Sequence, residues 1–440
     1  MTPSAKDAHR IVVAGGGAAG LELVTRLGAS LGRRGKARIT LVDHSRTHLW
    51  KPLLHSVAAG SLRRSRHELD YLAQARWRHF DYAFGEVTGL DRAGRRLLLG
   101  AMDDDEGRQI TPPRAIAYDT LIMAIGSVTN DFGTPGAAQF AVPLETPDQA
   151  SRFNRRLLNA CLRANVQEGA VRPGQLHVAI IGAGATGTEL AAELHHTARE
   201  LIAYGLDRID PERDLKIVLI EAADRILPAL PERISKATRA LLEGLGVEVR
   251  PGARVAEVRA DGVVLTTGEV IPSELVVWSA GVKAPEVLHD FGGLETNAIN
   301  QLLVTDTLQT TRDPDIFAIG DCASCPQPGG AGPVPPRAQA AHQMAAHMVG
   351  QMRRRLGGKP LTPYVYKDFG SLVSLGRYST VGSLMGFLLG RGLFVEGLFA
   401  RLMYRSLYAS HEAALYGRRS VLWRTLLGAA HGPTPSVKLH

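Results

Sequence analysis

Two stretches of the chain repeat one pattern of apolar and polar residues. In each stretch, a short apolar run leads into a glycine-rich turn that opens a helix. A second apolar run follows and ends in an acidic residue. This pattern predicts two parallel strands joined by a helix. The first stretch runs from Arg10 to Asp43 and the second from His177 to Glu221. We therefore expect an α/β fold with two Rossmann-like domains.

The turn of each stretch has the spacing G-x-G-x-x-G. In such a turn the first glycine allows a tight bend, the second lets the backbone approach a pyrophosphate, and the third lets helix and strand pack closely. One copy is a weak signal, but two copies in the right context favour two dinucleotide-binding domains. The alternative is a pair of structural turns. The glycines are Gly15, Gly17 and Gly20 in the first turn and Gly182, Gly184 and Gly187 in the second.

An acidic residue ends the second strand of each stretch, Asp43 in the first and Glu221 in the second. A carboxylate at this place accepts hydrogen bonds from ribose hydroxyls. It would also repel a 2′-phosphate, so Glu221 favours NADH over NADPH in the second domain. Arg225 lies nearby in the sequence and would weaken that preference. The alternative is an ordinary acid at a strand end.

Three further apolar runs end in glycine and complete the predicted sheets. They cover residues 118–126, 274–281 and 315–320, and Asp321 follows the last of them. A helix is expected from Arg337 to about Leu356. The predicted division of the chain is a first domain over residues 1–150, a second domain over 151–310, a return to the first domain over 311–360, and a C-terminal region over 361–440.

The net charge of +8 is concentrated near the C-terminus. Residues 351–440 contain 13 Lys and Arg against 3 Asp and Glu, whereas the other 350 residues sum to −2. A basic region of this kind favours nucleic acid or an anionic membrane surface as its partner, and the alternative is a solvated basic face. The overall composition, with 45% hydrophobic and 21% charged residues, is typical of a globular protein.

No stretch of the sequence is apolar enough for a membrane-spanning helix, which needs about 18 uncharged residues. Residues 398–415 instead predict an amphipathic helix, with Arg401 and Arg405 on one stripe and apolar residues opposite. Such a helix suits the boundary between lipid tails and anionic headgroups, so we expect a C-terminal amphipathic helical membrane-anchoring region. A dimerisation helix or a core helix is the alternative. Residues 1–9 have no apolar segment like that of a secretory signal, which predicts a cytoplasmic location.

The three cysteines are too few for a disulfide scaffold. Cys322 and Cys325 form a C-x-x-C pair, a spacing found in redox dithiols and in half of a zinc site. A zinc site needs four ligands, and the sequence has no second C-x-x-C. We therefore expect no metal and interpret the pair as small residues packed behind the turn at Asp321. Whether the pair binds a metal or is redox-active stays open.

Six segments of the sequence match the pattern of one known family: residues 47–55, 118–126, 182–193, 319–323, 335–343 and 366–375. With these segments the chain resembles the type II NADH:quinone oxidoreductases, the single-chain respiratory NADH dehydrogenases, and above all their enterobacterial form. The resemblance covers nearly the whole chain, from Arg10 to His440. Ser56 and Ala59 depart from the enterobacterial pattern, which has Glu and Thr there, so the tuning of the site beside the flavin stays open.

The resemblance implies a set of site residues. Gln339 and Gln343 would meet quinone, and Glu189 is expected to act with them in catalysis and to contact NADH. Because residues four apart share one helical face, both amides can point at one ligand, and the alternative is two exposed helix amides. FAD would contact Gly15, Gly17, Gly20, Asp43, Lys51, Val87, Gly126 and Asp321, and NADH would contact Gly182, Gly184, Gly187, Glu221 and Gly281.

The function implied by the resemblance is entry of electrons into a respiratory chain. Two electrons would pass from NADH through FAD to a membrane quinone, without proton pumping. The protein would lie on the cytoplasmic face of the inner (plasma) membrane, bound to anionic lipid as a peripheral or monotopic protein, with no nucleic acid partner. Homodimer formation is compatible with this function.

Two other functions stay open. One is a soluble NADH-dependent reductase of a ferredoxin-type partner, and the other is a membrane-bound flavoprotein that senses NADH without useful turnover. The sequence identifies neither the quinone nor the oligomeric state.

Overall fold

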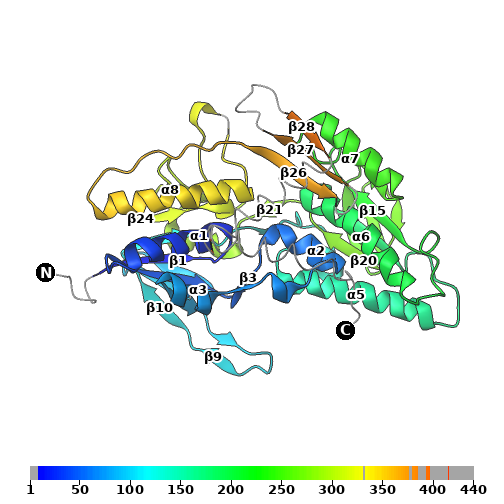
Figure 1. Ribbon diagram of the computed structural model, residues 1–440, viewed down its shortest axis with the longest axis horizontal. Helices are drawn as coiled ribbons and strands as arrows, with labels where there is room; N and C mark the ends of the chain where they lie inside the picture. Colours follow the sequence, from blue (N-terminus) through cyan, green and yellow to red (C-terminus); the bar gives the residue numbers. More distant parts are fainter. Residues whose placement is uncertain (1–7, 331, 376–378, 385–392, 397–414, 416–440) are drawn as a thin grey trace, which may run out of the picture.

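A six-stranded sheet forms the centre of the first domain (Figure 1). The structure is a computed structural model that describes residues 8–330, 332–375, 379–384, 393–396 and 415. The strand order is β23-β24-β11-β1-β2-β5, and all strands are parallel except β23 at one edge. Their bounds are β1 His9–Ala14, β2 Ala37–Asp43, β5 Asp81–Phe84, β11 Thr120–Met123, β23 Gln309–Thr310 and β24 Asp313–Ala318. The apolar runs that predicted the first two parallel strands are β1 and β2.

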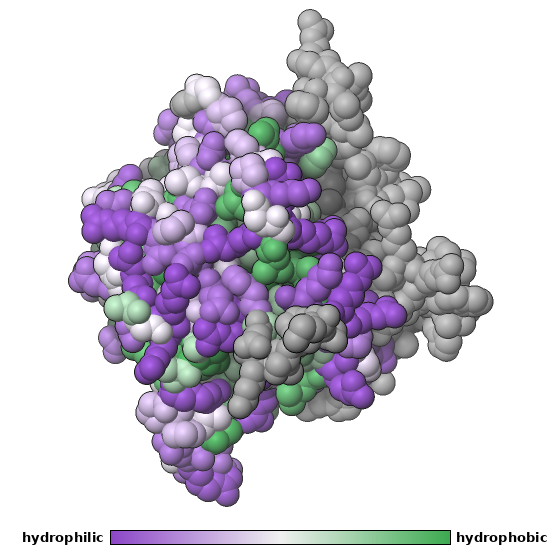
Figure 2. All heavy atoms as spheres, turned by 90° about the vertical axis from the view of Figure 1, so that its left-hand side faces the viewer, coloured by the Kyte–Doolittle hydropathy of each residue, from purple (hydrophilic) through white to green (hydrophobic). Residues whose placement is uncertain are grey.

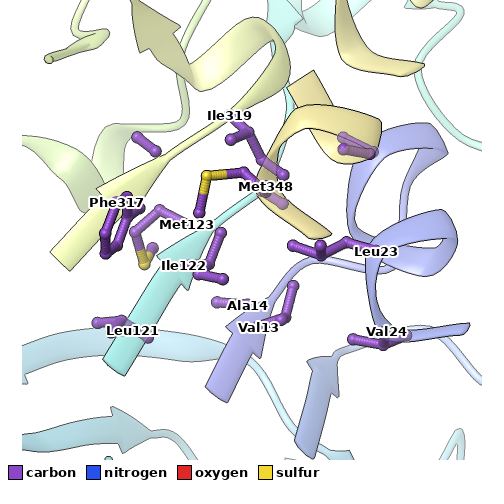
Figure 3. Packing of buried hydrophobic residues seen from close by; sticks show 14 of the residues in the cluster. Val13, Ala14, Leu23, Val24, Leu121, Ile122, Met123, Phe317, Ile319 and Met348 are labelled. Atoms are coloured by element: carbon purple, nitrogen blue, oxygen red, sulfur yellow. The ribbon is translucent and has the colours of Figure 1, made fainter. Parts of the chain in front are cut away.

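Two helices from distant parts of the sequence pack against each other and onto this sheet. They are α1 (Ala18–Leu27) and α8 (Ala338–Leu356), and α3 (Tyr71–Arg78) packs against α1 and β5. Because the central strands are covered on both faces, their sequences are continuously apolar rather than alternating. Figure 3 shows side chains from β1, β11, β24, α1 and α8 meeting in this core, among them Val13, Leu23, Ile122, Phe317 and Met348.

The second domain has a five-stranded sheet in which every strand is parallel to its neighbours. The order is β13 (Ala141–Pro143), β20 (Leu275–Trp278), β14 (His177–Ile181), β15 (Lys216–Ile220) and β16 (Glu248–Arg250). Its helices are α5 (Pro147–Val166), α6 (Ala185–Ala203) and α7 (Glu232–Gly244). Strand β13 ends at Pro143, and α5 begins at Pro147 with Thr146 as its N-cap, so both elements begin before residue 150. The second sheet thus begins before the division drawn from the sequence.

Each domain also carries a small antiparallel sheet. In the first domain it consists of β6 (Val87–Asp91), β7 (Arg96–Leu99) and β10 (Arg114–Ala117), and in the second of β17 (Val255–Arg259), β18 (Gly262–Leu265) and β19 (Val270–Pro272). The hairpin of β8 (Met102–Asp103) and β9 (Gln109–Thr111) projects from the lower edge in Figure 1. Figure 2 shows that the lower projection of the molecule is mostly hydrophilic.

A short antiparallel pair links the two domains. Strand β12 (Val128–Thr129) follows the last large strand before the second domain, and β21 (Val282–Lys283) follows the last large strand inside it. The two pair with each other, so the chain enters and leaves the second domain at one place. The remaining short elements include β3 (Thr47–His48), β4 (Leu69–Asp70), α2 (Leu54–Ala59), α4 (Ala137–Phe140), β22 (Leu302–Leu303) and β25 (Ala323–Ser324).

The described part of the C-terminal region contains strands. They are β26 (Gly370–Leu375), β27 (Ser379–Leu384) and β28 (Leu393–Glu396), which pair antiparallel, and β26 packs on α6. Leu415 is buried in the core of the first domain, and its carbonyl accepts hydrogen bonds from Gln74 and Arg78 on α3. The amphipathic helix expected at residues 398–415 lies outside the described residues, except for Leu415. Among the helices that the structure describes, none is long and apolar enough to cross a bilayer.

Candidate functional site

The two glycine-rich turns have the same backbone geometry. Gly15 and Gly182 have φ angles of +101° and +100°, in the left-handed region that favours glycine. A Cβ atom on Gly20 would overlap the carbonyl oxygen of Gly15, and one on Gly187 would overlap that of Gly182. The third glycine of each motif therefore permits the close contact between strand and helix that the sequence predicted.

The first turns of α1 and α6 offer space for an anionic group. Gly17 and Gly184 are the residues before these helices, and neither helix has a side-chain cap at its N-terminus. A Cβ atom on either glycine would meet nothing within 4 Å. Because free N–H groups at a helix N-terminus attract phosphate, both places fit the pyrophosphate of a dinucleotide.

The acid at the end of each second strand holds the glycine turn in place. Oδ2 of Asp43 accepts a hydrogen bond from the backbone N–H of Gly16 at 2.6 Å, and Oε2 of Glu221 accepts one from that of Ala183 at 2.8 Å. The other oxygen of each carboxylate accepts a backbone N–H two residues further along the chain. Both acids thus lie beside the turn, where an adenosine ribose would reach them.

A second cluster lies where β11 and β24 of the first sheet end. Lys51, in the short 3-10 helix Lys51–Leu53, donates through Nζ to the carbonyl of Ser127 at 2.9 Å. The hydroxyl of Ser127 donates to Oδ2 of Asp321 at 2.8 Å, and Gln301 donates to the Asp321 carbonyl at 2.8 Å. The structure therefore brings together Lys51, Gly126 and Asp321, three of the residues expected to contact FAD. Ser127 and Gln301 were missed, because no motif marks either residue.

Two side chains cover the first glycine turn. The hydroxyl of Tyr71 donates to the carbonyl of Gly16 at 2.7 Å, and its ring occupies the place of a Cβ on Gly16. His48 is fully buried, and burial lowers its pKa to about 4, so its imidazole is neutral at pH 7. Val87 is half-buried at the start of β6, on the edge of the same core. No motif in the sequence marks Tyr71.

An exposed aromatic ring stands at the end of β20. Phe132 is 67% exposed, and its ring occupies the place of a Cβ on Gly281. Its φ of +52° is a strained value for a residue with a side chain and costs about 1–3 kcal/mol. The loop is fixed by Trp278, whose indole N–H donates to the carbonyl of Asn130 at 3.0 Å. This ring lies beside Gly281, one of the residues expected to contact NADH.

Glu189 is buried at the start of α6, two residues after the last glycine of the second motif. One of its oxygens lies 3.3 Å from Nδ1 of His55, which is also buried. His55 belongs to a segment that carries the resemblance, but it was assigned no role of its own from the sequence.

Gln339 and Gln343 share one face of α8, as their spacing predicted, and both hold a neighbouring segment of the chain. Gln339 donates to Asp368 at 3.0 Å and to the carbonyl of Gly370 at 3.1 Å, and its own oxygen accepts the N–H of Phe369. Gln343 donates to the carbonyl of Lys367 at 2.8 Å and accepts its N–H at 3.0 Å. The two half-buried amides therefore fix residues 367–370 against the helix.

All three cysteines are buried free thiols. Burial raises the pKa of both Cys322 and Cys325 to about 11, so neither is a thiolate at pH 7. Thiolates are the reactive form in redox exchange and metal binding. Cys322 packs in the core beside the turn at Asp321, which agrees with a packing role.

Comparison with known proteins identifies the family. Residues 9–345 match the model of the pyridine nucleotide-disulphide oxidoreductase family. A type II NADH:quinone oxidoreductase of Haemophilus influenzae is 42% identical over 419 residues, which cover 92% of this chain and 94% of that protein. One from Mycobacterium tuberculosis is 29% identical, with coverage of 86% of this chain and 80% of that protein.

Solved structures agree in fold. The structure of NDH2 from Plasmodium falciparum in complex with NADH superposes with a TM-score of 0.78 at 18% identity, and covers 98% of this chain and 100% of that one. The chain has two glycine turns and two strand-end acids, and its similarity to the Haemophilus influenzae protein covers 92% of its length. It therefore belongs to the type II NADH:quinone oxidoreductases, the enzymes that transfer electrons from NADH to quinone.

Proposed function

We propose that the protein binds FAD in its first domain and NADH in its second, and passes two electrons from NADH through FAD to a quinone in the membrane. The observation that carries this proposal is the pair of matching dinucleotide sites, each with an uncapped helix N-terminus and a strand-end carboxylate. Bound FAD supplies the hydride and electron chemistry. The reaction moves no charge across the membrane, so we expect no proton pumping.

In this proposal, the chain's residues bind and orient the two dinucleotides. The N–H groups at the starts of α1 and α6 bind the pyrophosphates, and Asp43 and Glu221 accept hydrogen bonds from the ribose hydroxyls. Lys51 and Asp321 lie at the sheet edge where the flavin would extend from its pyrophosphate, with Ser127 holding both in place. Phe132 and Gly281 would bound the nicotinamide end of NADH.

We expect the enzyme to prefer NADH because of the charge of Glu221. Arg225 does not neutralise this charge, since its guanidinium donates to the carbonyls of Pro228 and Leu230. Glu221→Gln keeps an oxygen that can accept the N–H of Ala183 but removes the charge that repels a 2′-phosphate. The ratio of kcat/KM for NADH to that for NADPH should fall about ten-fold, the equivalent of about 1.4 kcal/mol. An unchanged ratio would show that Glu221 does not face the ribose.

On the quinone side, we propose that Gln339 and Gln343 build the acceptor site by fixing residues 367–370. The side chain of Phe369 in this segment is 51% exposed, so it is free to contact an apolar acceptor. A short-chain quinone, purified holoenzyme and NADH provide the test of the proposed function: NADH oxidation should require the quinone. A protein that bleaches its flavin with NADH but passes no electrons to quinone would contradict the proposal and support a sensor or a reductase of another partner.

Gln343→Ala should separate the two half-reactions. Loss of both hydrogen bonds to Lys367 loosens one end of the segment, while Gln339 still holds the rest. The rate of quinone reduction should therefore fall about ten-fold, because the acceptor is less well positioned. The rate of flavin bleaching by NADH should change by less than about two-fold, because that step uses the second domain. Stopped-flow absorbance of the flavin measures both rates. An equal loss in both would place Gln343 outside the quinone site.

We also propose that the basic C-terminal region attaches the protein to the cytoplasmic face of the inner (plasma) membrane. The support is the charge of residues 351–440, which hold 13 of the 51 Lys and Arg but only 3 of the 43 Asp and Glu. Basic residues near an anionic surface contribute about 1 kcal/mol each. Quinone lives in the bilayer, so attachment would bring the acceptor site to its substrate.

A further inference from the structure

A buried imidazole lies between two carboxylates where the two domains meet. His55 is on α2 of the first domain, and Glu189 and Glu193 are on α6 of the second. The Nδ1 atom of His55 is 3.3 Å from Oε2 of Glu189, and its Nε2 atom is 3.9 Å from Oε2 of Glu193. The His55 side chain is only 4% exposed. Three ionisable groups therefore share a site with little access to water.

The neighbouring elements hold the cluster in this arrangement. Glu189 and Glu193 are one turn apart on α6 and so share a face, against which α2 packs. The hydroxyl of Ser61 donates to Glu193, and the amide of Asn154 on α5 donates to the carbonyl of Ala58 at 3.1 Å, which fixes the end of α2. Strand β26 also packs on α6 and contains no ionisable residue. Helix α5, which also packs on α2, carries Arg152, Arg155 and Arg156. Among the described residues, the ion-pair partners of His55 are the two carboxylates.

An imidazole between two carboxylates favours a second proton in the cluster. A neutral imidazole has one N–H group and one lone pair, so one of its nitrogens would direct a lone pair at a carboxylate oxygen. That contact is repulsive unless the carboxyl is protonated or the imidazole carries a second proton. Besides the proton of the neutral ring, the cluster can therefore hold a second proton, which has places to rest on Glu193, His55 and Glu189.

The two carboxyl groups differ in their access to solvent. The side chain of Glu193 is 16% exposed and that of Glu189 is 7% exposed. Glu189 is also the nearer to the glycine turn of the second domain, two residues after Gly187. Glu193 is therefore the carboxyl group nearer to solvent, and Glu189 is the one nearer to the interior.

The overall reaction consumes one proton that the substrates do not bring. NADH, quinone and one proton give NAD⁺ and quinol, in which one hydrogen comes from NADH and the other from water. We propose that this proton reaches the interior through Glu193, His55 and Glu189, with His55 as the residue that positions Glu189 and relays the proton to it. This inference rests on the proposed function and assigns a path to its proton.

Each step of the relay is balanced. Protonated Glu193 gives its proton to Nε2 of His55 while the proton on Nδ1 passes to Glu189, and Glu193 then takes a new proton from solvent. A rotation of the Glu193 carboxyl or a bridging water closes the 3.9 Å separation during the first step. No oxidant or reductant takes part. Glu189 passes its proton to the quinone as the quinol forms, and a turn of the imidazole ring about its Cβ–Cγ bond brings the remaining N–H back to the side of Glu189.

The test compares His55→Gln with a matched control in holoenzyme of the full chain. Glutamine keeps the polarity and approximate reach of histidine but cannot carry a proton. His177→Gln is the control, because His177 is half-buried at the start of β14, bonds to the carbonyl of Pro272, and lies at the opposite end of that strand from the glycine turn. Glu193→Gln removes the outer carboxyl and provides a second variant should His55→Gln fail to fold.

Two measurements separate a relay from a structural role. The first is the pH profile of the quinone half-reaction. In His55→Gln, the rate on the plateau should fall about a hundred-fold or more, the lower end of the range for a lost proton transfer. The pH at which the rate begins to fall on the alkaline side should also change. The NADH half-reaction should slow by much less than the quinone half-reaction. The second is the infrared spectrum of the resting holoenzyme against pH, in which a buried carboxylic acid C=O band should be present in wild type, be lost in Glu193→Gln and shift in His55→Gln.

The outcomes are distinct. A wild-type protein that reduces quinone, together with a His55→Gln variant that keeps its pH profile and its infrared band, would overturn the relay and leave the proposed function intact. A wild-type protein that reduces no quinone would overturn the proposed function, and the infrared band would still show whether the cluster shares a proton. Equal slowing of both half-reactions in His55→Gln would show a structural role and refute the relay.

Discussion

Gly20→Ala should yield a protein that contains no FAD. A Cβ atom at this position would overlap the carbonyl oxygen of Gly15, which belongs to the backbone and cannot move aside without opening the turn. Separating strand from helix would displace the N–H groups that bind the pyrophosphate, so the flavin affinity should fall by more than about a hundred-fold. The flavin absorbance of the purified protein, expressed per mole of protein, measures this loss.

Two matched variants control this prediction. Gly187→Ala places the same strain in the second domain and should weaken NADH binding while FAD is retained. Gly350→Ala changes a glycine inside α8 where a Cβ atom would meet nothing within 4 Å, and should stabilise the helix by up to about 1 kcal/mol. Retention of FAD by Gly20→Ala, or loss of FAD from Gly187→Ala, would refute the assignment of FAD to the first domain.

Removal of residues 397–440 should release the protein from membranes. The deletion removes six of the chain's Lys and Arg against one acid. At about 1 kcal/mol for each basic residue near an anionic surface, the partition onto lipid should fall by more than about a hundred-fold. Sedimentation with vesicles that contain an anionic lipid measures the change. The cut after β28 leaves the three-stranded sheet β26-β27-β28 intact.

The deletion also removes Leu415, which is buried in the core of the first domain. Leu415→Ala in the full chain is therefore the control, since it creates the same cavity, at a cost of about 2–5 kcal/mol, and keeps every charge. This variant should be less stable but should still sediment with vesicles. A truncated protein that still sediments would place membrane attachment elsewhere. Loss of flavin from both the truncated protein and Leu415→Ala would show that the C-terminal region is part of the globular fold.

Local patterns in the sequence predicted the parts of the structure that local interactions determine. The glycine turns, the strands β1 and β2, and the acids Asp43 and Glu221 could be located because each signal lies within about 45 residues of chain. The same holds for the shared helical face of Gln339 and Gln343. Their hydrogen bonds to residues 367–370 could not be predicted, because nothing in a helical period identifies which segment will lie beside it.

The contacts that complete the candidate site join distant residues. Ser127 and Asp321 are separated by 194 positions, and Ser61 and Glu193 by 132. Pairings over such distances depend on the placement of whole domains, which neither periodicity nor residue type encodes. The C-terminal region shows the same limit, since its strand β28 pairs with β27 and β26 packs on α6. Its apolar residues indicated burial but did not identify the neighbour.

The pairing of β12 with β21 has a consequence for biosynthesis. The chain leaves the sheet of the first domain after β11 and returns to it only at β23, so the second domain is continuous and the first is interrupted. As the protein emerges from the ribosome, the second domain has its whole sheet available by Trp278, whereas the first still lacks β24 and α8. Domains fold as units in the order in which their parts are synthesised. We therefore expect the inserted domain to fold first and the first domain to close only after α8 has been synthesised.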